Sequence, residues 1–194
     1  MNTNRHECPG VRILAYACAI VVLSSISSSA QQLENPSFEE SKDKKKPHYE
    51  EAADWGRWGA YFNRHDDWDT PHNGKCMLAY HHWLISDNAT SGVYQDVEKS
   101  EAGATYEFSV QVFVDKDANA DHLELRIEKL WGNGVVAEKK FYFGSIKPGS
   151  WERLSIRGTP EEQGLRVTLV VAPAIDKARS GSIKFDDAKI RKLK

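Results

Sequence analysis

Apolar and polar residues alternate with a period of two along much of this chain, which is the pattern of β-strands that bury one face. The longest example is residues 104–115, and the alternation recurs at 123–128 and 166–171. Within the first run, one face holds Tyr106, Phe108, Val110, Val112 and Val114, and the other holds Glu107, Ser109, Gln111 and Phe113. Shorter candidate strands are 55–62, 75–83, 92–98, 135–143, 151–157 and 182–190. Helical periodicity is almost absent, so the pattern predicts an all-β protein.

Turn-forming residues separate these runs at the spacing of a β-sandwich. Residues 131–134 read Trp-Gly-Asn-Gly, a hairpin signal between two strands. Residues 101–103, 147–149 and 161–164 are further turn segments rich in glycine and polar residues. About ten strands in a single unit of this length predict an antiparallel two-sheet β-sandwich of the jelly-roll kind.

Residues 1–30 have the three parts of a cleavable signal peptide in order. Arg5 and Arg12 give a positive start, residues 13–26 are mostly apolar, and residues 28–30 are small. The apolar run is shorter than the roughly 20 residues that span a bilayer. We therefore expect cleavage after Ala30, a single domain over 31–194, no stable membrane insertion, and a secreted, periplasmic or cell-surface location.

Charge and cysteine content narrow the classes further. Removing residues 1–30, which carry two arginines and one glutamate, changes the formal net charge from −2 to −3. The chain has no long basic block, so we expect no nucleic-acid partner. Only Cys76 remains after cleavage. It lies in an apolar run, which favours a buried, unreactive thiol and excludes an internal disulfide.

Several short motifs, taken in order, resemble the carbohydrate-binding modules of families 4, 9 and 22, which are galactose-binding-like jelly rolls. The motifs are Asn-Pro-Ser-Phe-Glu at 35–39, Asn-Gly-Lys at 73–75, 91–97, 102–109, Trp151 and 181–190. The resemblance spans nearly all of the chain after residue 30. It implies a noncatalytic protein whose partner is a polysaccharide or oligosaccharide.

The resemblance also implies a structural calcium ion where residues 35–39 meet the last strand. Carried over, Glu39 and Asp186 are the expected side-chain ligands, and carbonyl groups near Lys75 complete the shell. Calcium prefers such oxygen ligands. Asp187 is the adjacent carboxylate, and alternation along a strand makes it unlikely that both aspartates reach one ion. An ordinary solvated acidic pair is the alternative.

Six tryptophans are many for this length, and a flat indole suits the apolar face of a sugar ring. Alternation puts Trp55 and Tyr61 on one face of the 55–62 run and Trp58 on the other, so that run divides between core and surface. Trp55 is the first candidate platform, with Trp58 or Trp83 taking its place if Trp55 is buried. Candidate sugar-binding residues are Trp55, Trp58, Tyr61, Trp83, Gln95, Gln111 and Arg126.

Two other classes stay open. A glycoside hydrolase would need paired carboxylates, for which Asp96, Glu107, Glu124 and Glu128 are candidates, although nothing in the sequence marks any of them as an acid catalyst. A structural or adhesive domain without a sugar ligand is the second alternative, since such modules usually accompany a catalytic domain. Gln95 also has a second interpretation, in which it braces a strand.

Overall fold

The computed structural model describes residues 33–45, 51–66, 70–84, 86–175 and 180–193. The expected signal peptide lies outside this range. The described chain contains ten strands and two short 3-10 turns, and none of its helices is long and apolar enough to cross a membrane. The strands are β1 Gly56–Trp58, β2 Phe62–His65, β3 Met77–Tyr80, β4 Ser91–Val97, β5 Tyr106–Val114, β6 Ala120–Lys129, β7 Val135–Tyr142, β8 Trp151–Gly158, β9 Leu165–Pro173 and β10 Ile183–Lys192.

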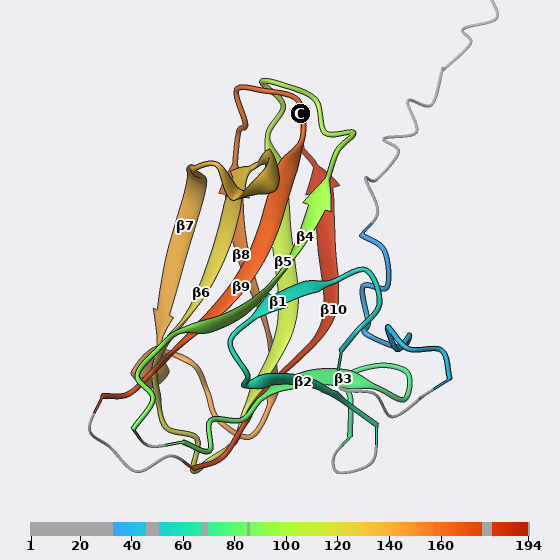
Figure 1. The fold of residues 1–194 in the computed structure, drawn as a ribbon. Helices are drawn as coiled ribbons and strands as arrows, with labels where there is room; N and C mark the ends of the chain where they lie inside the picture. Colours follow the sequence, from blue (N-terminus) through green and yellow to red (C-terminus); the bar gives the residue numbers. More distant parts are fainter. Residues whose placement is uncertain (1–32, 46–50, 67–69, 85, 176–179, 194) are drawn as a thin grey trace, which may run out of the picture.

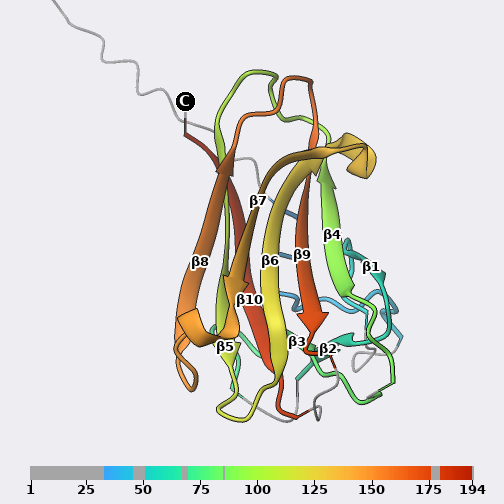
Figure 2. The same cartoon turned by 90° about the vertical axis from the view of Figure 1, so that its left-hand side faces the viewer.

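The strands form two five-stranded antiparallel sheets packed face to face, and the predicted all-β sandwich is confirmed (Figure 1). Sheet I has the order β1-β4-β9-β6-β7, and sheet II has the order β2-β3-β10-β5-β8. In Figure 2, sheet I is seen with β7, β6, β9, β4 and β1 side by side. Because many neighbours in each sheet are distant in sequence, the loops cross between sheets, as in a jelly roll.

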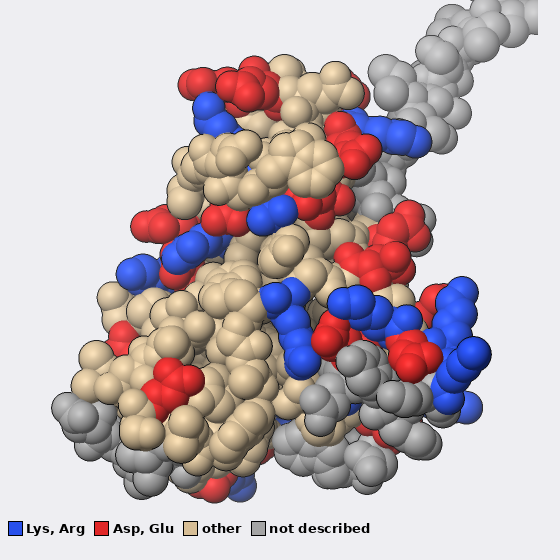
Figure 3. Space-filling model, viewed as in Figure 1, with Lys and Arg blue, Asp and Glu red and all other residues tan. Residues whose placement is uncertain are grey.

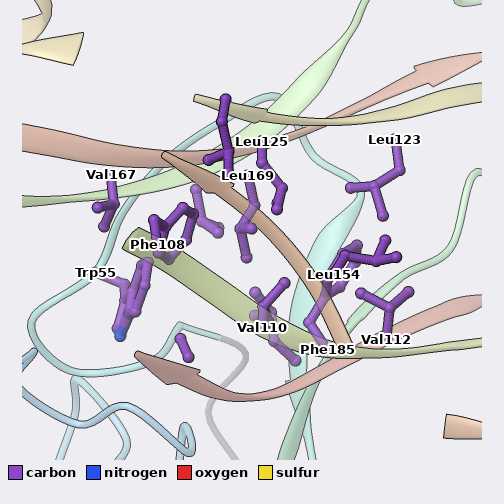
Figure 4. Close-up of a cluster of buried hydrophobic side chains, with 14 of the residues drawn as sticks. Trp55, Phe108, Val110, Val112, Leu123, Leu125, Leu154, Val167, Leu169 and Phe185 are labelled. Atoms are coloured by element: carbon purple, nitrogen blue, oxygen red, sulfur yellow. The ribbon is translucent and has the colours of Figure 1, made fainter. Parts of the chain in front are cut away.

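The inward faces of the two sheets supply the core. Leu123, Leu125 and Leu169 of sheet I meet Phe108 and Phe185 of sheet II, and all five side chains are fully buried. Figure 4 shows these side chains pointing toward one another between the ribbons. Their spacing of two along each strand leaves the intervening residues on the outer faces, so the sequence alternation directly sets which side chains can meet a ligand.

The predicted strand at 55–62 is wrong, because this segment contributes to both sheets. Gly56–Trp58 pairs with β4 in sheet I, whereas Phe62–His65 pairs with β3 in sheet II. Gly59 lies between them with a φ of 71°, a left-handed conformation that glycine adopts without steric cost. The turn at this glycine carries the chain from one layer to the other.

Candidate functional site

The outer face of sheet I holds two aromatic rings that lie across glycines of the neighbouring strand. Trp58 pairs with Gly92, and Gly56 pairs with Tyr94. A Cβ atom on Gly92 would lie 2.1 Å from the Trp58 ring, and one on Gly56 would lie 2.3 Å from the Tyr94 ring. Each ring therefore rests directly on the sheet, and the two ring centroids are 6.4 Å apart with planes 33° from parallel.

Charged side chains continue this face across β9 and β6. The Arg166 guanidinium donates two hydrogen bonds to Asp96, at 2.9 and 2.7 Å, and its Cζ lies 3.9 Å from the Tyr94 ring centroid. Arg126 binds Glu124 in the same bidentate way, with both contacts at 2.9 Å. Such forked contacts fix the orientation of both partners.

The strand register places these groups in rows. One row runs from Trp58 through Gly92 and Val170 to Glu124. Val170 and Glu124 are each only 2 % exposed, so the row between the indole and the carboxylate is buried. Thr168 lies in the adjacent row and donates a hydrogen bond of 2.7 Å to Glu128.

Ion pairs keep the acidic and basic side chains of this face charged and hold them in position. Burial alone would raise the pKa of Glu124, but the hydrogen bond and charge of Arg126 outweigh it and the pKa is lowered. The pKa of Arg166 is raised, chiefly by its hydrogen bond to Asp96. In the face seen in Figure 3, acidic and basic side chains lie next to one another. A neutral ligand with many hydroxyl groups would meet donors and acceptors that are already oriented.

A shallow hollow borders the Tyr94 ring. It has a volume of about 350 Å³ and is lined by Glu34, Asp54, Gly56, Tyr94, Gln95 and Asp96. Its walls are rich in carboxylate and amide oxygens, which suits a ligand that donates hydrogen bonds.

Only two of the seven sequence-predicted sugar contacts lie on this face, Trp58 and Arg126. The expectation that Trp55 forms a platform is wrong. Its side chain is 5 % exposed, its ring packs 5.1 Å from Phe38, and its Nε1 donates to the Asn35 carbonyl. The N-terminal segment covers the indole, so no sugar can stack on it.

Two more predicted residues have other partners. Tyr61 is buried, stacks on His82, and donates to Asp87 at 2.7 Å. Gln95 is buried and bonds to the backbone of Glu34 and Asp54. Its amide therefore braces the segment before β1, as the second interpretation of this residue held.

The remaining two lie elsewhere on the surface. Trp83 is 55 % exposed in the β3–β4 connection, with its ring edge-on to Tyr61 at 4.7 Å. Gln111 lies on the outer face of sheet II. Sequence reasoning did not select Tyr94, Arg166 or Thr168, although the alternation of β4 and β9 would have put all three on the outer face.

The four predicted metal-site residues meet around the turn at residues 73–76. Glu39 Oε1 accepts hydrogen bonds from the Lys75 and Cys76 amides, at 2.9 and 3.1 Å. Asp186 is fully buried, and its oxygens accept from the Asn73 and Asp187 amides. Burial raises the pKa of Asp186 to about 6, against the lowering effect of those hydrogen bonds.

A β-bulge between Asp186 and Lys189 brings the second aspartate to the same end of the turn. Asp187 has a φ of 46°, accepts a hydrogen bond from Ser37 at 2.7 Å, and lies 2.6 Å from His72 Nδ1. Burial alone would raise the pKa of Asp187, but the contacts with Ser37 and His72 lower it.

In the structure, the expected calcium ligands have other hydrogen-bond partners. Among the described residues, no three His, Cys, Asp or Glu side chains stand close enough to hold a metal. The carboxylates instead accept hydrogen bonds from backbone N–H groups. The buried Arg64 guanidinium donates to the Phe38 and Glu39 carbonyls and to Cys76 Sγ, so a cation already lies where residues 38–39 meet the turn. Calcium at this junction stays a prediction to be measured.

The Cys76 side chain is buried, as its apolar surroundings in the sequence predicted. Burial raises the pKa of its thiol. A protonated, enclosed thiol is a poor nucleophile.

The candidate carboxylates of the hydrolase alternative are engaged in ion pairs or hydrogen bonds. Glu124 and Asp96 are each held by a guanidinium, and Glu128 accepts from Thr168. Glu107 lies on the opposite sheet, among arginines. An acid catalyst needs a raised pKa, whereas the pKa values of Glu107 and Glu124 are lowered.

The two-sheet β-sandwich is similar in fold to solved carbohydrate-binding modules. A family 61 carbohydrate-binding module in complex with β-1,4-galactotriose is 16 % identical, with a TM-score of 0.55 over 83 % of this chain and 97 % of that one. The xylan-binding CBM22-1 domain of Paenibacillus barcinonensis Xyn10C is also 16 % identical, with a TM-score of 0.51 over 81 % and 92 %.

An enzyme shares the same architecture. A cyclase from Fischerella sp. TAU is 11 % identical, with a TM-score of 0.60 over 83 % of this chain and 96 % of that one. No family model matches the sequence, and neither does any curated protein. The similarity of fold to carbohydrate-binding modules agrees with the resemblance read from the motifs at 35–39 and 181–190.

Proposed function

We propose that this protein binds an oligosaccharide or polysaccharide without catalysis, on the outer face of sheet I. The observation that carries the proposal is Trp58 lying across Gly92, beside Tyr94 and in a row that ends at Glu124. An indole held against the outer surface of a sheet offers an apolar surface that a sugar ring can stack on. The similarity in fold to a galactotriose-bound module and a xylan-binding domain supports the same class of ligand.

The polar groups of the face would read the sugar hydroxyls. Arg126 and Arg166 are partly exposed and are held by Glu124 and Asp96, so little side-chain entropy is lost when a ligand binds. One or two stacked rings and a few hydrogen bonds give a Kd of about 10 µM to 1 mM after the cost of association.

The test is affinity for soluble β-1,4-galactan and xylan oligosaccharides, measured by calorimetry on the wild type and on Trp58→Ala. We expect at least about a tenfold loss of affinity, which corresponds to about 1.4 kcal/mol. The melting temperature should change little, since the Trp58 ring lies on the outside of the sheet. Product analysis of the same mixtures should detect no cleavage of the glycan.

Trp83→Ala is the matched control, because Trp83 is an exposed tryptophan outside the strands of sheet I. It should bind like the wild type. If Trp83→Ala loses affinity and Trp58→Ala does not, the site lies at the β3–β4 connection. If the folded protein binds neither these nor other plant, algal or microbial glycans at millimolar concentration, the structural or adhesive alternative takes its place.

Export is a further part of the proposal, and it rests on the order of charge, apolar run and small residues in positions 1–30. Expression of the full chain with fractionation should yield a processed protein outside the cytoplasm. Mass spectrometry of its N-terminus should find Gln31 as the first residue. An unprocessed cytoplasmic product would contradict this part alone and leave the binding proposal unaffected.

A further inference from the structure

The outer face of sheet II carries a cluster of positive charge that the proposed site does not use. Glu107 of β5 lies between Arg191 of β10 and Arg157 of β8 in the strand register. Two residues along, Ser109 lies between Lys189 and Ser155 in the same way. Four residues along β5 from Glu107, Gln111 faces Arg153.

One buried carboxylate organises three of these cations. Arg153, Arg157 and Arg191 each donate to Glu107, at 2.6, 3.1 and 3.0 Å. The Glu107 side chain is 4 % exposed, whereas the arginine side chains are 46 %, 65 % and 51 % exposed. Counting Lys189, which pairs with Ser109 two residues along β5, the four cations exceed the single charge of Glu107 by three, on a protein whose net charge is −2.

A hollow lies beside this cluster. It has a volume of about 400 Å³, and its lining includes Arg153, Lys189, Ser109, Gln111 and Asn73. Asp187 also lines it, and that carboxylate is engaged by Ser37 and His72. The hollow therefore combines cations on its rim with hydroxyl and amide groups on its floor.

The backbones of Arg153 and Arg157 are four residues apart on one strand, about 13 Å, but their guanidinium groups converge with that of Arg191 on the Glu107 carboxylate. Lys189 lies on β10 beside Ser109 and extends the positive charge along the face. A polymer with several anionic groups can contact the arginines and the lysine together.

We propose that the outer face of sheet II binds an acidic polysaccharide, one that carries carboxylate or sulfate groups, at a site separate from the outer face of sheet I. Guanidinium groups match planar or tetrahedral oxyanions through two parallel hydrogen bonds. Ser155 and Gln111, which are partly exposed, pair with sugar hydroxyls between the charges. None of the described residues lining the hollow is aromatic, and Phe113 and Trp151, 5.6 Å apart, lie further along the same face.

The test is binding of the purified protein to polygalacturonate and to a sulfated glycan, compared with neutral galactan, by affinity electrophoresis at several salt concentrations. We expect retention by an acidic glycan that weakens as salt rises, because the contacts are exposed ion pairs. Arg157→Gln and Lys189→Gln should each weaken this binding by about fivefold, the change that an exposed ion pair carries.

Two controls separate this site from the proposed sugar site. Lys99→Gln makes the same change of charge in the β4–β5 connection and should leave acidic-glycan binding unchanged. Trp58→Ala should reduce binding of neutral glycan only. Each single variant keeps two arginines on Glu107 or leaves all three, so the fold should be retained, which a melting curve checks.

Four results would overturn the proposal. The first is no retention by any acidic glycan at low salt, and the second is a loss in Arg157→Gln and Lys189→Gln no larger than in Lys99→Gln. The third is equal loss in Trp58→Ala, which would assign the acidic glycan to sheet I. The fourth is equal retention of duplex DNA, which would make the face a general polyanion surface with no preference for a saccharide.

Discussion

The outer faces of the two sheets use arginine in opposite ways. On sheet I, Arg166 pairs with Asp96, and Arg126 pairs chiefly with Glu124, with Glu128 at 3.8 Å. On sheet II, three guanidiniums share Glu107. Both faces have the same antiparallel geometry and the same alternation, so the difference lies only in which residues occupy the outward positions.

This difference decides which ligands each face suits. Matched pairs cancel at a distance and leave oriented hydrogen-bonding groups, which suits neutral hydroxyls next to an indole. An unmatched cluster keeps a long-range positive potential that attracts anions. One β-sandwich can therefore offer two chemically distinct surfaces without any change to its core.

The largest expected effect is a loss of stability when Arg64 is replaced, at the junction beside the sheet II hollow. A calcium ion bound at this junction would add positive charge to the outer face of sheet II. Arg64 already supplies a cation there, bonded to the Phe38 and Glu39 carbonyls. Arg64→Met should lower the free energy of unfolding by about 3 kcal/mol, because it leaves buried acceptors without a charged donor. Denaturant titration measures this change. Arg57→Met should lower the free energy of unfolding much less, because Arg57 is partly exposed.

The same junction tests the calcium expectation. With Arg64 in place, excess chelator or millimolar calcium should leave the melting temperature of the wild type unchanged. A chelator-dependent fall of about 2 to 8 °C, absent in Asp186→Ala, would instead establish a calcium site and show that the turn at residues 73–76 rearranges to hold the ion.

The second prediction tests whether the sheet I face depends on its glycines. A Cβ atom on Gly92 would lie 2.1 Å from the Trp58 ring and 2.6 Å from the Leu169 carbonyl oxygen. Gly92→Ala should destabilise the protein by about 1 to 3 kcal/mol and displace the indole. Its affinity for neutral glycan should fall at least as far as that of Trp58→Ala, while acidic-glycan binding stays.

Gly144→Ala is the control, since nothing lies within 4 Å of its Cβ position. It should match the wild type in stability and in both binding assays. Normal neutral-glycan binding by Gly92→Ala would mean that the ring need not lie flat on the sheet, and the row from Trp58 to Glu124 would lose its role.

The layers of the fold could be predicted from the sequence because each long strand has one face in the core. In β5, β6 and β9, inward residues such as Val110, Leu125 and Leu169 alternate with polar ones, and the strands lie within a few residues of the expected ranges. The 55–62 run failed because local alternation does not say which sheet a residue joins. Gly59 divides that run between the two layers.

The candidate site was less predictable, since it depends on contacts that are distant in sequence. Trp55 and Trp58 look alike locally, and only the packing of Phe38 from the N-terminal segment determines that Trp55 is buried. Gln95 follows Tyr94 on β4 and so points inward, but the backbone groups of Glu34 and Asp54 that its amide meets there are distant in sequence. The expected calcium ligands do meet, yet Arg64, which has no motif, takes the carbonyl groups between them.

The smallest expected effect compares the two organising carboxylates by pH. Burial alone would raise the pKa of Glu107, but hydrogen bonds from Arg153 and Arg157 outweigh it and lower the pKa below the ordinary 4.5. A group with a lowered folded-state pKa stabilises the fold above its unfolded-state pKa, and this stabilisation is lost as the pH falls through the folded-state value. Glu107→Gln should therefore reduce the free energy of unfolding by about 1 kcal/mol at pH 7, and the difference from the wild type should shrink below about pH 4.5. Glu124→Gln should follow the same course, since the pKa of Glu124 is also lowered.

The binding readouts should separate the two variants: Glu124→Gln weakens neutral-glycan binding, whereas Glu107→Gln adds one net positive charge to sheet II and strengthens acidic-glycan binding at low salt. If Glu107→Gln weakens acidic-glycan binding, the carboxylate is needed to hold its three arginines in position, and pre-organisation of the cluster outweighs its net charge.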